Sequence, residues 1–277
     1  MIFSLIFPGN SLGGYVGCSL TGVITELQKR NISVEIVSND NLKLLNERCV
    51  SCAITMDWRR DFLKNYHEYV SLPLIRINGE SDHLNEVYSV LIDGMTSMQQ
   101  VTDRLWQLGH RKIGFFFFDS LDHELNNAAK RQQGFLKVMH ELGSENPEQF
   151  CTYNCTERDS GELAALLKNW YDKGVTALLF ANAAGTTKMF SIINSLKINV
   201  PDELTLIGWE DEVVSPFTTP PLSTLYPDPY AQARAAVDLL ERIMAREQNI
   251  SDVLIPYQWI ERQSIAPPRI KPDGQGA

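Results

Sequence analysis

The stretch from Val200 to Leu225 reads VPDELTLIGWEDEVVSPFTTPPLSTL, and it decides the fold. Leu204 to Ile207 is a short apolar run of the kind that forms a strand buried on both faces. Pro201 and Asp202 punctuate its start, and a glycine ends it. A strand of this type is typical of a parallel sheet that is covered by helices on both sides.

Polar residues follow this strand directly. Trp209, Glu210 and Asp211 come immediately after it, and ligands of open α/β sheets bind at the carboxyl ends of the strands. The prolines at 216, 220 and 221 then exclude helix and force an extended backbone. An aromatic residue and two carboxylates at a strand end, followed by a stiff segment, predict a ligand site beside a hinge.

The same stretch resembles the LacI/GalR family of bacterial regulators, in which a run of the form i-P-e-d-l-s-v-i-G-f-D-D leads into t-P-P-L-T-T-v. Glu210 stands where that family usually has Asp. Two further motifs are similar to the family, G-H-R-K-I at 109–113 and R-Q-Q-G-F at 131–135. In the family the arginine of the second motif points into a cleft between two lobes, where a guanidinium suits a carboxylate or adjacent hydroxyls.

The composition limits the possible functions. The 277 residues carry a formal net charge of −9, which argues against direct binding of nucleic acid by this chain. The apolar start of the chain stops at Pro8 and lacks the features of a signal peptide, and no run is long enough to span a membrane. The five cysteines are an odd number, so we expect reduced thiols that pack as small apolar groups in a cytoplasmic protein, with no metal and no cofactor.

Apolar runs and helical stripes alternate along the chain. Strands are expected at 2–7, 34–37, 50–54, 72–77, 88–92, 113–118, 150–154, 175–180, 204–207, 222–225 and 253–260. Helices are expected after the turn at 9–11 and at 41–48, 59–69, 95–108, around Arg131, and at 160–173, 189–196 and 228–246. This order predicts an α/β fold. The resemblance implies two doubly wound parallel-sheet lobes joined by three crossings, as in type I periplasmic binding proteins.

The resemblance also divides the chain. The N-terminal lobe is expected to comprise 1–110 and 225–249, and the C-terminal lobe 111–222 and 252–266. Residues 267–277 form a tail rich in proline and glycine, which we expect to be disordered.

The resemblance implies a small polar ligand between the lobes, and it favours a sugar. Carboxylates and amides bond sugar hydroxyls, and an aromatic ring packs on the sugar face. The expected ligand residues are Arg131, Asn182, Glu210 and Trp209 from the second lobe, and Asp93, Asn10 and Tyr15 from the first. Alternatives stay open, because Asn10 fits an ordinary turn between strand and helix, and Arg131 fits a solvated helix position. For His110, at a strand entrance, we favour a structural, inter-lobe role over a catalytic one.

The first functional hypothesis is therefore the effector-sensing and dimerising core of a LacI/GalR-type transcriptional regulator. In that family an open/closed equilibrium changes how paired DNA-binding headpieces are spaced, and this sequence would contact DNA only through a headpiece that it does not contain. We expect a homodimer. The alternative is a stand-alone solute-binding or sugar-binding protein. An enzyme would have to use Glu210 and Asp211 as an acid/base pair, and no G-x-S-x-G, P-loop, H-E-x-x-H or full G-x-G-x-x-G motif supports one.

Overall fold

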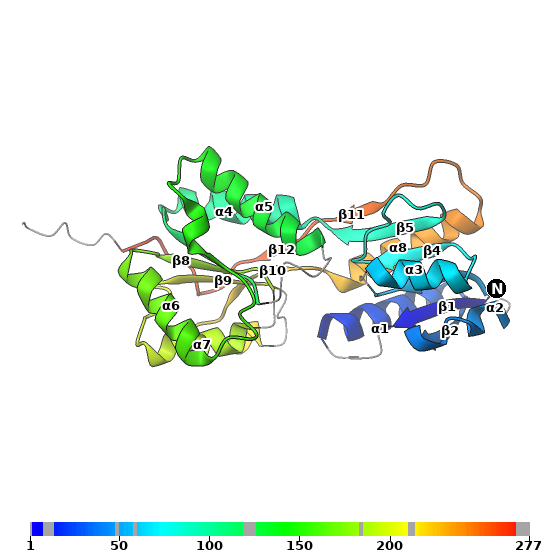
Figure 1. The fold of residues 1–277 in the computed structure, drawn as a ribbon, viewed down its shortest axis with the longest axis horizontal. Coiled ribbons are helices and arrows are strands. Elements are labelled where there is room, and N and C mark those ends of the chain that lie inside the picture. The colour runs from blue at the N-terminus through cyan, green and yellow to red at the C-terminus, as the bar shows by residue number, and fades with distance from the viewer. Residues whose placement is uncertain are drawn as a thin grey trace, which may run out of the picture. The chain divides into compact units, whose positions relative to one another are not determined.

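The chain folds into two units, each with its own six-stranded sheet (Figure 1). The computed structural model describes residues 2–7, 14–47, 50–57, 60–118, 126–182, 185–209 and 214–269. Unit 1 comprises the residues up to Asp93 together with 228–256, and unit 2 comprises most of 94–227 together with the residues from Tyr257 onward. Apart from the short segment at Asn126, which groups with unit 1, the chain passes from one unit to the other three times, and the predicted fold class is confirmed.

Unit 1 contains six parallel strands in the order β11-β5-β4-β3-β1-β2. The strands are β1 (Ile2–Phe7), β2 (Ser33–Ser38), β3 (Val50–Thr55), β4 (Leu74–Ile77), β5 (Val87–Ile92) and β11 (Val253–Ile255). The helices are α1 (Gly14–Lys29), α2 (Leu44–Glu47), α3 (Arg60–Tyr69) and α8 (Pro229–Met244).

The two faces of the unit 1 sheet have separate cores. In β3, Cys52 and Ile54 belong to the cluster that α1 and α8 complete, whereas Ala53 belongs to the cluster with α3. This alternation is the period of two that a strand imposes on its side chains. Gly22 of α1 allows the close approach of α8, since a Cβ on Gly22 would lie 2.8 Å from Cβ of Ala233.

Helix α8 begins where the sequence predicts. The carboxylate of Asp228 accepts hydrogen bonds from the backbone N–H groups of Tyr230 and Ala231, both at 2.9 Å, and Pro229 occupies the first helical position. These bonds satisfy two of the donors that the first turn of a helix leaves open.

Unit 2 has strands in the order β12-β10-β9-β8-β6-β7, of which only the β10–β12 pair is antiparallel. The strands are β6 (Ile113–Phe116), β7 (Cys151–Thr152), β8 (Ala177–Phe180), β9 (Thr205–Trp209), β10 (Ser223–Tyr226) and β12 (Gln258–Ile260). The helices are α4 (Gly94–Gln107), α5 (Asn126–Glu141), α6 (Ser160–Asp172) and α7 (Thr186–Ser195).

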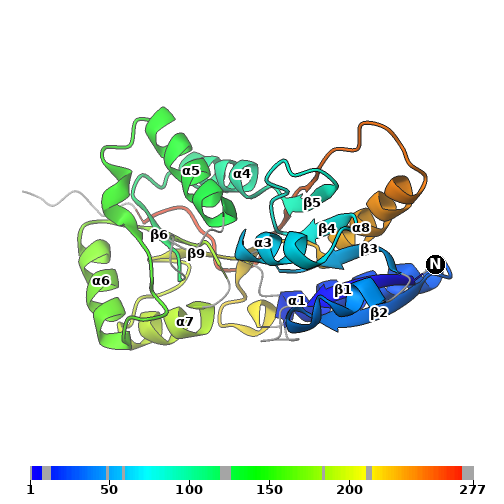
Figure 2. The ribbon, with the colours of Figure 1, turned by 45° about the vertical axis from the view of Figure 1, so that its right-hand side comes forward.

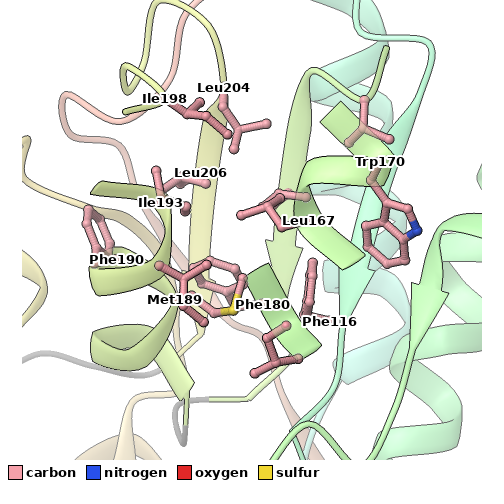
Figure 3. Packing of buried hydrophobic residues seen from close by; sticks show 14 of the residues in the cluster. Phe116, Leu167, Trp170, Phe180, Met189, Phe190, Ile193, Ile198, Leu204 and Leu206 are labelled. Carbon is pink, nitrogen blue, oxygen red and sulfur yellow. The ribbon is translucent and has the colours of Figure 1, made fainter. Parts of the chain in front are cut away.

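Helices cover both faces of this second sheet. Figures 1 and 2 show α4 and α5 on one side of the strands and α6 and α7 on the other. On the α6/α7 side, Phe116, Trp170 and Phe180 form the centre of a large apolar cluster, with Phe116 and Trp170 ring centroids 4.9 Å apart (Figure 3). All four residues of β8 are buried, as the continuous apolar run predicts.

The boundaries between the units differ from the expected ones. Helix α4 belongs to unit 2, because Met98, Val101 and Leu105 pack into the core beside Ile113. The single strand expected at 253–260 is wrong: β11 joins the first sheet and β12 the second. Pro256 lies between them, and proline cannot donate to a sheet ladder.

The start of the expected tail is ordered. The carbonyl of Ala266 accepts a hydrogen bond from Thr205 Oγ1 at 2.9 Å, and the Ala266 N–H donates to the same hydroxyl at 3.0 Å. Arg269 lies 3.5 Å from the carboxylate of Glu203. Residues 267–269, which we expected to be disordered, therefore pack on unit 2, and 270–277 lie outside the described residues.

The described cysteines are free thiols. Burial raises the pKa of Cys52 and of Cys151 to about 12, so both remain protonated near neutral pH. Cys49 lies outside the described residues, and within the described ranges no group of three or more His, Cys, Asp or Glu residues could hold a metal ion. None of the helices in these ranges is long and apolar enough to cross a membrane.

Candidate functional site

Arg131, on α5, reaches the carboxyl ends of two neighbouring strands of unit 2. Its Nη1 donates to the carbonyl of Ala181, which directly follows β8, at 2.7 Å. Its guanidinium carbon lies 3.8 Å from the ring centroid of Trp209, the last residue of β9. The structure thus brings the arginine of the R-Q-Q-G-F motif to the edge of the sheet where ligands of α/β folds bind.

The other residues of the motif explain how Arg131 is positioned. Gly134 brings α5 against the start of α4, because a Cβ there would lie 2.4 Å from the backbone oxygen of Met95. Phe135 is fully buried, and its ring stacks on that of Phe115 in β6 at 5.2 Å. A glycine for close approach and a phenylalanine for the core therefore fix the helix from which Arg131 extends.

The ring of Trp209 lies against the guanidinium of Arg131. Its side chain is only 1% exposed, and the ring centroid of Tyr257 lies 4.0 Å from its own. A guanidinium stacked on a buried indole loses little side-chain freedom when it binds a further group. In this structure Trp209 holds Arg131 in place, and its predicted packing on a sugar face stays a prediction.

Asn182 follows β8 and is next in the chain to Ala181, whose carbonyl Arg131 contacts. Its side-chain Oδ1 accepts a hydrogen bond from the backbone N–H of Phe118 at 3.0 Å, and the side chain is buried. This bond ties the end of β8 to the end of β6 and fixes the orientation of the amide. Arg131, Asn182 and Trp209, all predicted from the sequence, therefore lie together at one edge of unit 2.

Among the described residues of this edge, the Nε of Arg131 is a hydrogen-bond donor that stays unfilled. Arg131 Nε is buried and has no hydrogen-bond partner among the residues that the structure describes. A buried donor that lacks a partner costs about 1–3 kcal/mol, and the cost disappears when an acceptor binds. A hydroxyl, carboxylate or phosphate oxygen of a small ligand would satisfy it.

Unit 1 carries a second group of polar side chains at the carboxyl ends of its strands. Arg76 of β4 is completely buried, and its Nη2 donates to the carbonyl of Asp57 at 3.1 Å. The carboxylate of Asp57, which follows β3, accepts a hydrogen bond from the side chain of Asn39. Gly79 makes room for the guanidinium, because a Cβ there would lie 2.6 Å from Arg76 Nε.

Tyr15 belongs to a separate network in unit 1. Its hydroxyl donates to the side-chain oxygen of Gln232 and accepts from Asn78 Nδ2 at 2.8 Å. Gln232 is fully buried in α8 and also donates to Asn78 Oδ1 at 3.0 Å. This hydroxyl joins α1 to α8 and to Asn78, which follows β4, and the contact of Tyr15 with a ligand stays a prediction.

The remaining predicted residues are Asp93, Asn10 and Glu210. Asp93 follows β5, as expected, and its backbone N–H donates to the carbonyl of Ile255 at 2.9 Å. Its contact with a ligand stays a prediction. Asn10 and Glu210 lie outside the described residues.

His110 fixes unit 2 internally. Its Nδ1 lies 2.8 Å from Thr176 Oγ1 and its Nε2 lies 3.0 Å from the carbonyl of Ala266. Since a carbonyl only accepts, Nε2 carries the proton and Nδ1 accepts from the threonine. Burial, and then the nearby charge of Arg111, lower the pKa of His110 to about 4. The expected structural role therefore holds within unit 2, where both partners lie, and not between lobes.

Sequence reasoning missed the partners of these residues. Tyr257 and Gln232 lie 48 and 217 residues from Trp209 and Tyr15, respectively. Neither is part of a motif, so the sequence offered no signal for these contacts. For Arg76, the only signal was a charged residue inside an otherwise apolar strand.

Comparison with known proteins agrees with this geometry. Residues 102–265, more than half of the chain, match the family described as "Periplasmic binding protein-like domain". The arabinose metabolism transcriptional repressor of Halalkalibacterium halodurans is 29% identical over 168 residues, covering 58% of this chain and 43% of that protein. The HTH-type transcriptional regulator GalR of Escherichia coli is 26% identical over 187 residues, covering 66% of this chain and 52% of that protein.

The fold is also that of solved regulators. A LacI family transcriptional regulator from Enterococcus faecium with bound ribose superposes with a TM-score of 0.77 at 17% identity, covering 97% of this chain and all of that one. The chain belongs to the periplasmic binding protein-like domain family, and its resemblance to LacI/GalR regulators is confirmed. Its relatives are transcriptional regulators rather than enzymes, and the chain spans about half the length of these two curated relatives.

Proposed function

We propose that this chain is the effector-sensing and dimerising part of a LacI/GalR-type transcriptional regulator. The observation that carries the proposal is Arg131, which stacks on Trp209 and donates to the carbonyl of Ala181, and whose buried Nε–H bonds to none of the described residues. A pre-positioned guanidinium with an open donor suits an oxygen-rich ligand. A stand-alone solute-binding protein is less well supported, because the relatives above are regulators.

The effector that we propose is a small polar metabolite, with a sugar as the first choice. One relative is named for arabinose metabolism, and one neighbour in fold holds ribose. Arg131 and Asn182 would bond to its hydroxyls, and Glu210, Asp93, Asn10 and Tyr15 stay as predicted additional contacts. Glu210 would add a carboxylate acceptor for sugar hydroxyls, complementing the donors of Arg131.

We propose a cytoplasmic homodimer that contacts DNA through a helix-turn-helix segment outside the two units described here. The GalR relative is named as an HTH-type regulator, which refers to a helix-turn-helix segment. The net charge of −9 supports this division, because an acidic surface does not attract phosphates. Sedimentation analysis would reveal a species of twice the chain mass, and a monomer at micromolar concentration would contradict the dimer.

A thermal-shift panel of pentoses, hexoses, disaccharides, phosphosugars and purines tests the choice of ligand. A ligand that binds only the folded state stabilises it by about 2.7 kcal/mol at a hundredfold excess over its Kd, so the melting temperature should rise with the logarithm of ligand concentration. A sugar that behaves in this way supports the proposal. A panel in which no sugar or phosphosugar shifts the melting temperature contradicts it.

A further inference from the structure

A cavity of about 320 Å³ lies in unit 2 between α4 and the strands β10 and β12. It is lined by Gln100, Val101, Arg104, Leu225, Tyr257, Trp259 and Glu261. All of these residues belong to one unit, so the cavity does not depend on how the two units are arranged. It is also distinct from the group of Arg131, Asn182 and the carbonyl of Ala181, none of which lines it.

The walls of this cavity suit a flat aromatic molecule. Tyr257 and Trp259 are two residues apart at strand β12, so both rings point to the same side of the strand. Leu225, which pairs with Trp259 across the two strands, and Val101 of α4 are buried and form an apolar floor. Cavities of about 300 Å³ and above with apolar walls and a few polar groups are typical of small-molecule sites.

Of the two charged residues that line the cavity, Arg104 and Glu261, the arginine is the one that suits an anion. The carboxylate of Glu261 accepts a hydrogen bond from the indole N–H of Trp259 at 3.2 Å. Arg104 is exposed, and in the described ranges its guanidinium has neither an ion-pair nor a hydrogen-bond partner. A ligand carboxylate is the group that such a planar, unpaired guanidinium binds best.

One wall of the cavity touches the residues that hold Arg131. The ring of Tyr257 lies 4.0 Å from that of Trp209, and Trp209 in turn lies 3.8 Å from the guanidinium carbon of Arg131. We propose that the cavity is a second small-molecule site, which takes a planar aromatic carboxylate and alters the position of Arg131 through Tyr257 and Trp209. An effect of this second ligand on effector affinity rests on the proposed function. Binding of the second ligand in the cavity does not.

Calorimetry with 2-naphthoate and with its uncharged amide, 2-naphthamide, tests the site. We expect one 2-naphthoate per chain, with affinity reduced at least tenfold in Trp259→Ala. Arg104→Gln should weaken the binding of 2-naphthoate by about tenfold and leave that of 2-naphthamide unchanged, because only 2-naphthoate has a carboxylate that can pair with the guanidinium. Arg111→Gln is the matched control, since Arg111 is also an exposed arginine of unit 2, stacked 4.3 Å from the ring centroid of Trp106.

Arg104→Gln is a surface substitution and should leave the fold intact. The Arg104→Gln measurement therefore still tests the site if Trp259→Ala does not fold. Absence of 2-naphthoate binding, or equal binding by Arg104→Gln and the parent, overturns the site. Fluorine NMR of 5-fluorotryptophan protein then tests the link, since 2-naphthoate should shift the Trp209 resonance as well as that of Trp259. Binding that leaves the Trp209 resonance unmoved overturns the link to Arg131. Failure of the sugar panel would leave all of these results unaffected.

Discussion

The buried histidine at the entrance of β6 makes unit 2 sensitive to acid. His110 is 1% exposed and its pKa is lowered from 6.5 to about 4, because burial disfavours the imidazolium. A lowered pKa means that the folded state binds fewer protons than the unfolded state between about pH 4 and 6.5. The contribution of His110 to stability is therefore complete above pH 6.5 and is lost as the pH falls through this window.

The size of the effect follows from the shift. The full difference of about 2.5 pKa units corresponds to about 3 kcal/mol, of which about 2 kcal/mol should be lost between pH 7.5 and pH 5. His110→Gln keeps a donor for the carbonyl of Ala266 but cannot titrate. It should be less stable than the parent at pH 7.5, because the bond from Thr176 is lost, and the gap should narrow by about 2 kcal/mol at pH 5.

Urea unfolding of the parent and of His110→Gln across this pH range measures the gap, with tryptophan fluorescence as the probe. Proton NMR of the imidazole Cε1–H adds a direct reading of the His110 pKa. The reasoning is refuted if His110 titrates at or above pH 6, or if the gap between the two proteins does not change with pH.

Three further predictions concern residues that hold the fold and the site in place. Gly134→Ala should destabilise the protein by about 1–3 kcal/mol, because its Cβ would meet the backbone oxygen of Met95 at 2.4 Å, and urea unfolding would detect this. Asp228→Ala should cost about 1 kcal/mol by removing the cap of α8, whereas Asp228→Asn, measured in the same way, should lose much less. Tyr257→Leu should weaken effector binding several-fold by loosening Trp209, and an unchanged affinity in calorimetry would argue against that support.

The sequence predicts the regular parts of this protein well for a physical reason. Strands buried on both faces are continuous apolar runs, and the run at 177–180 became the fully buried β8. The cap at Asp228 and the proline after it are local signals, and α8 begins there. These features depend on residues that are close together in the sequence, so they can be predicted before the tertiary structure is known.

Other features depend on residues that are distant in sequence. The contacts of Trp209 with Arg131 and with Tyr257, 48 residues later, join three separate parts of the chain, and no local pattern announces them. The apolar run at 253–260 looked like one strand, and its division at Pro256 between two sheets is a property of the fold as a whole. A sequence pattern identifies which residue types lie at a site. It does not show which side chain at the site holds another in position.

The most direct test of the account is calorimetric titration of the strongest sugar from the thermal-shift panel into Arg131→Ala and Arg111→Gln. Both arginines stack on a tryptophan of unit 2, but Arg131 lies at the carboxyl ends of the strands and Arg111 precedes the amino end of β6. Because a charged hydrogen bond contributes about 1.5–3 kcal/mol, Arg131→Ala should bind at least tenfold more weakly than the parent, with Arg111→Gln unchanged. Equal affinity of Arg131→Ala and the parent would contradict the assignment of this edge of unit 2 as the effector site.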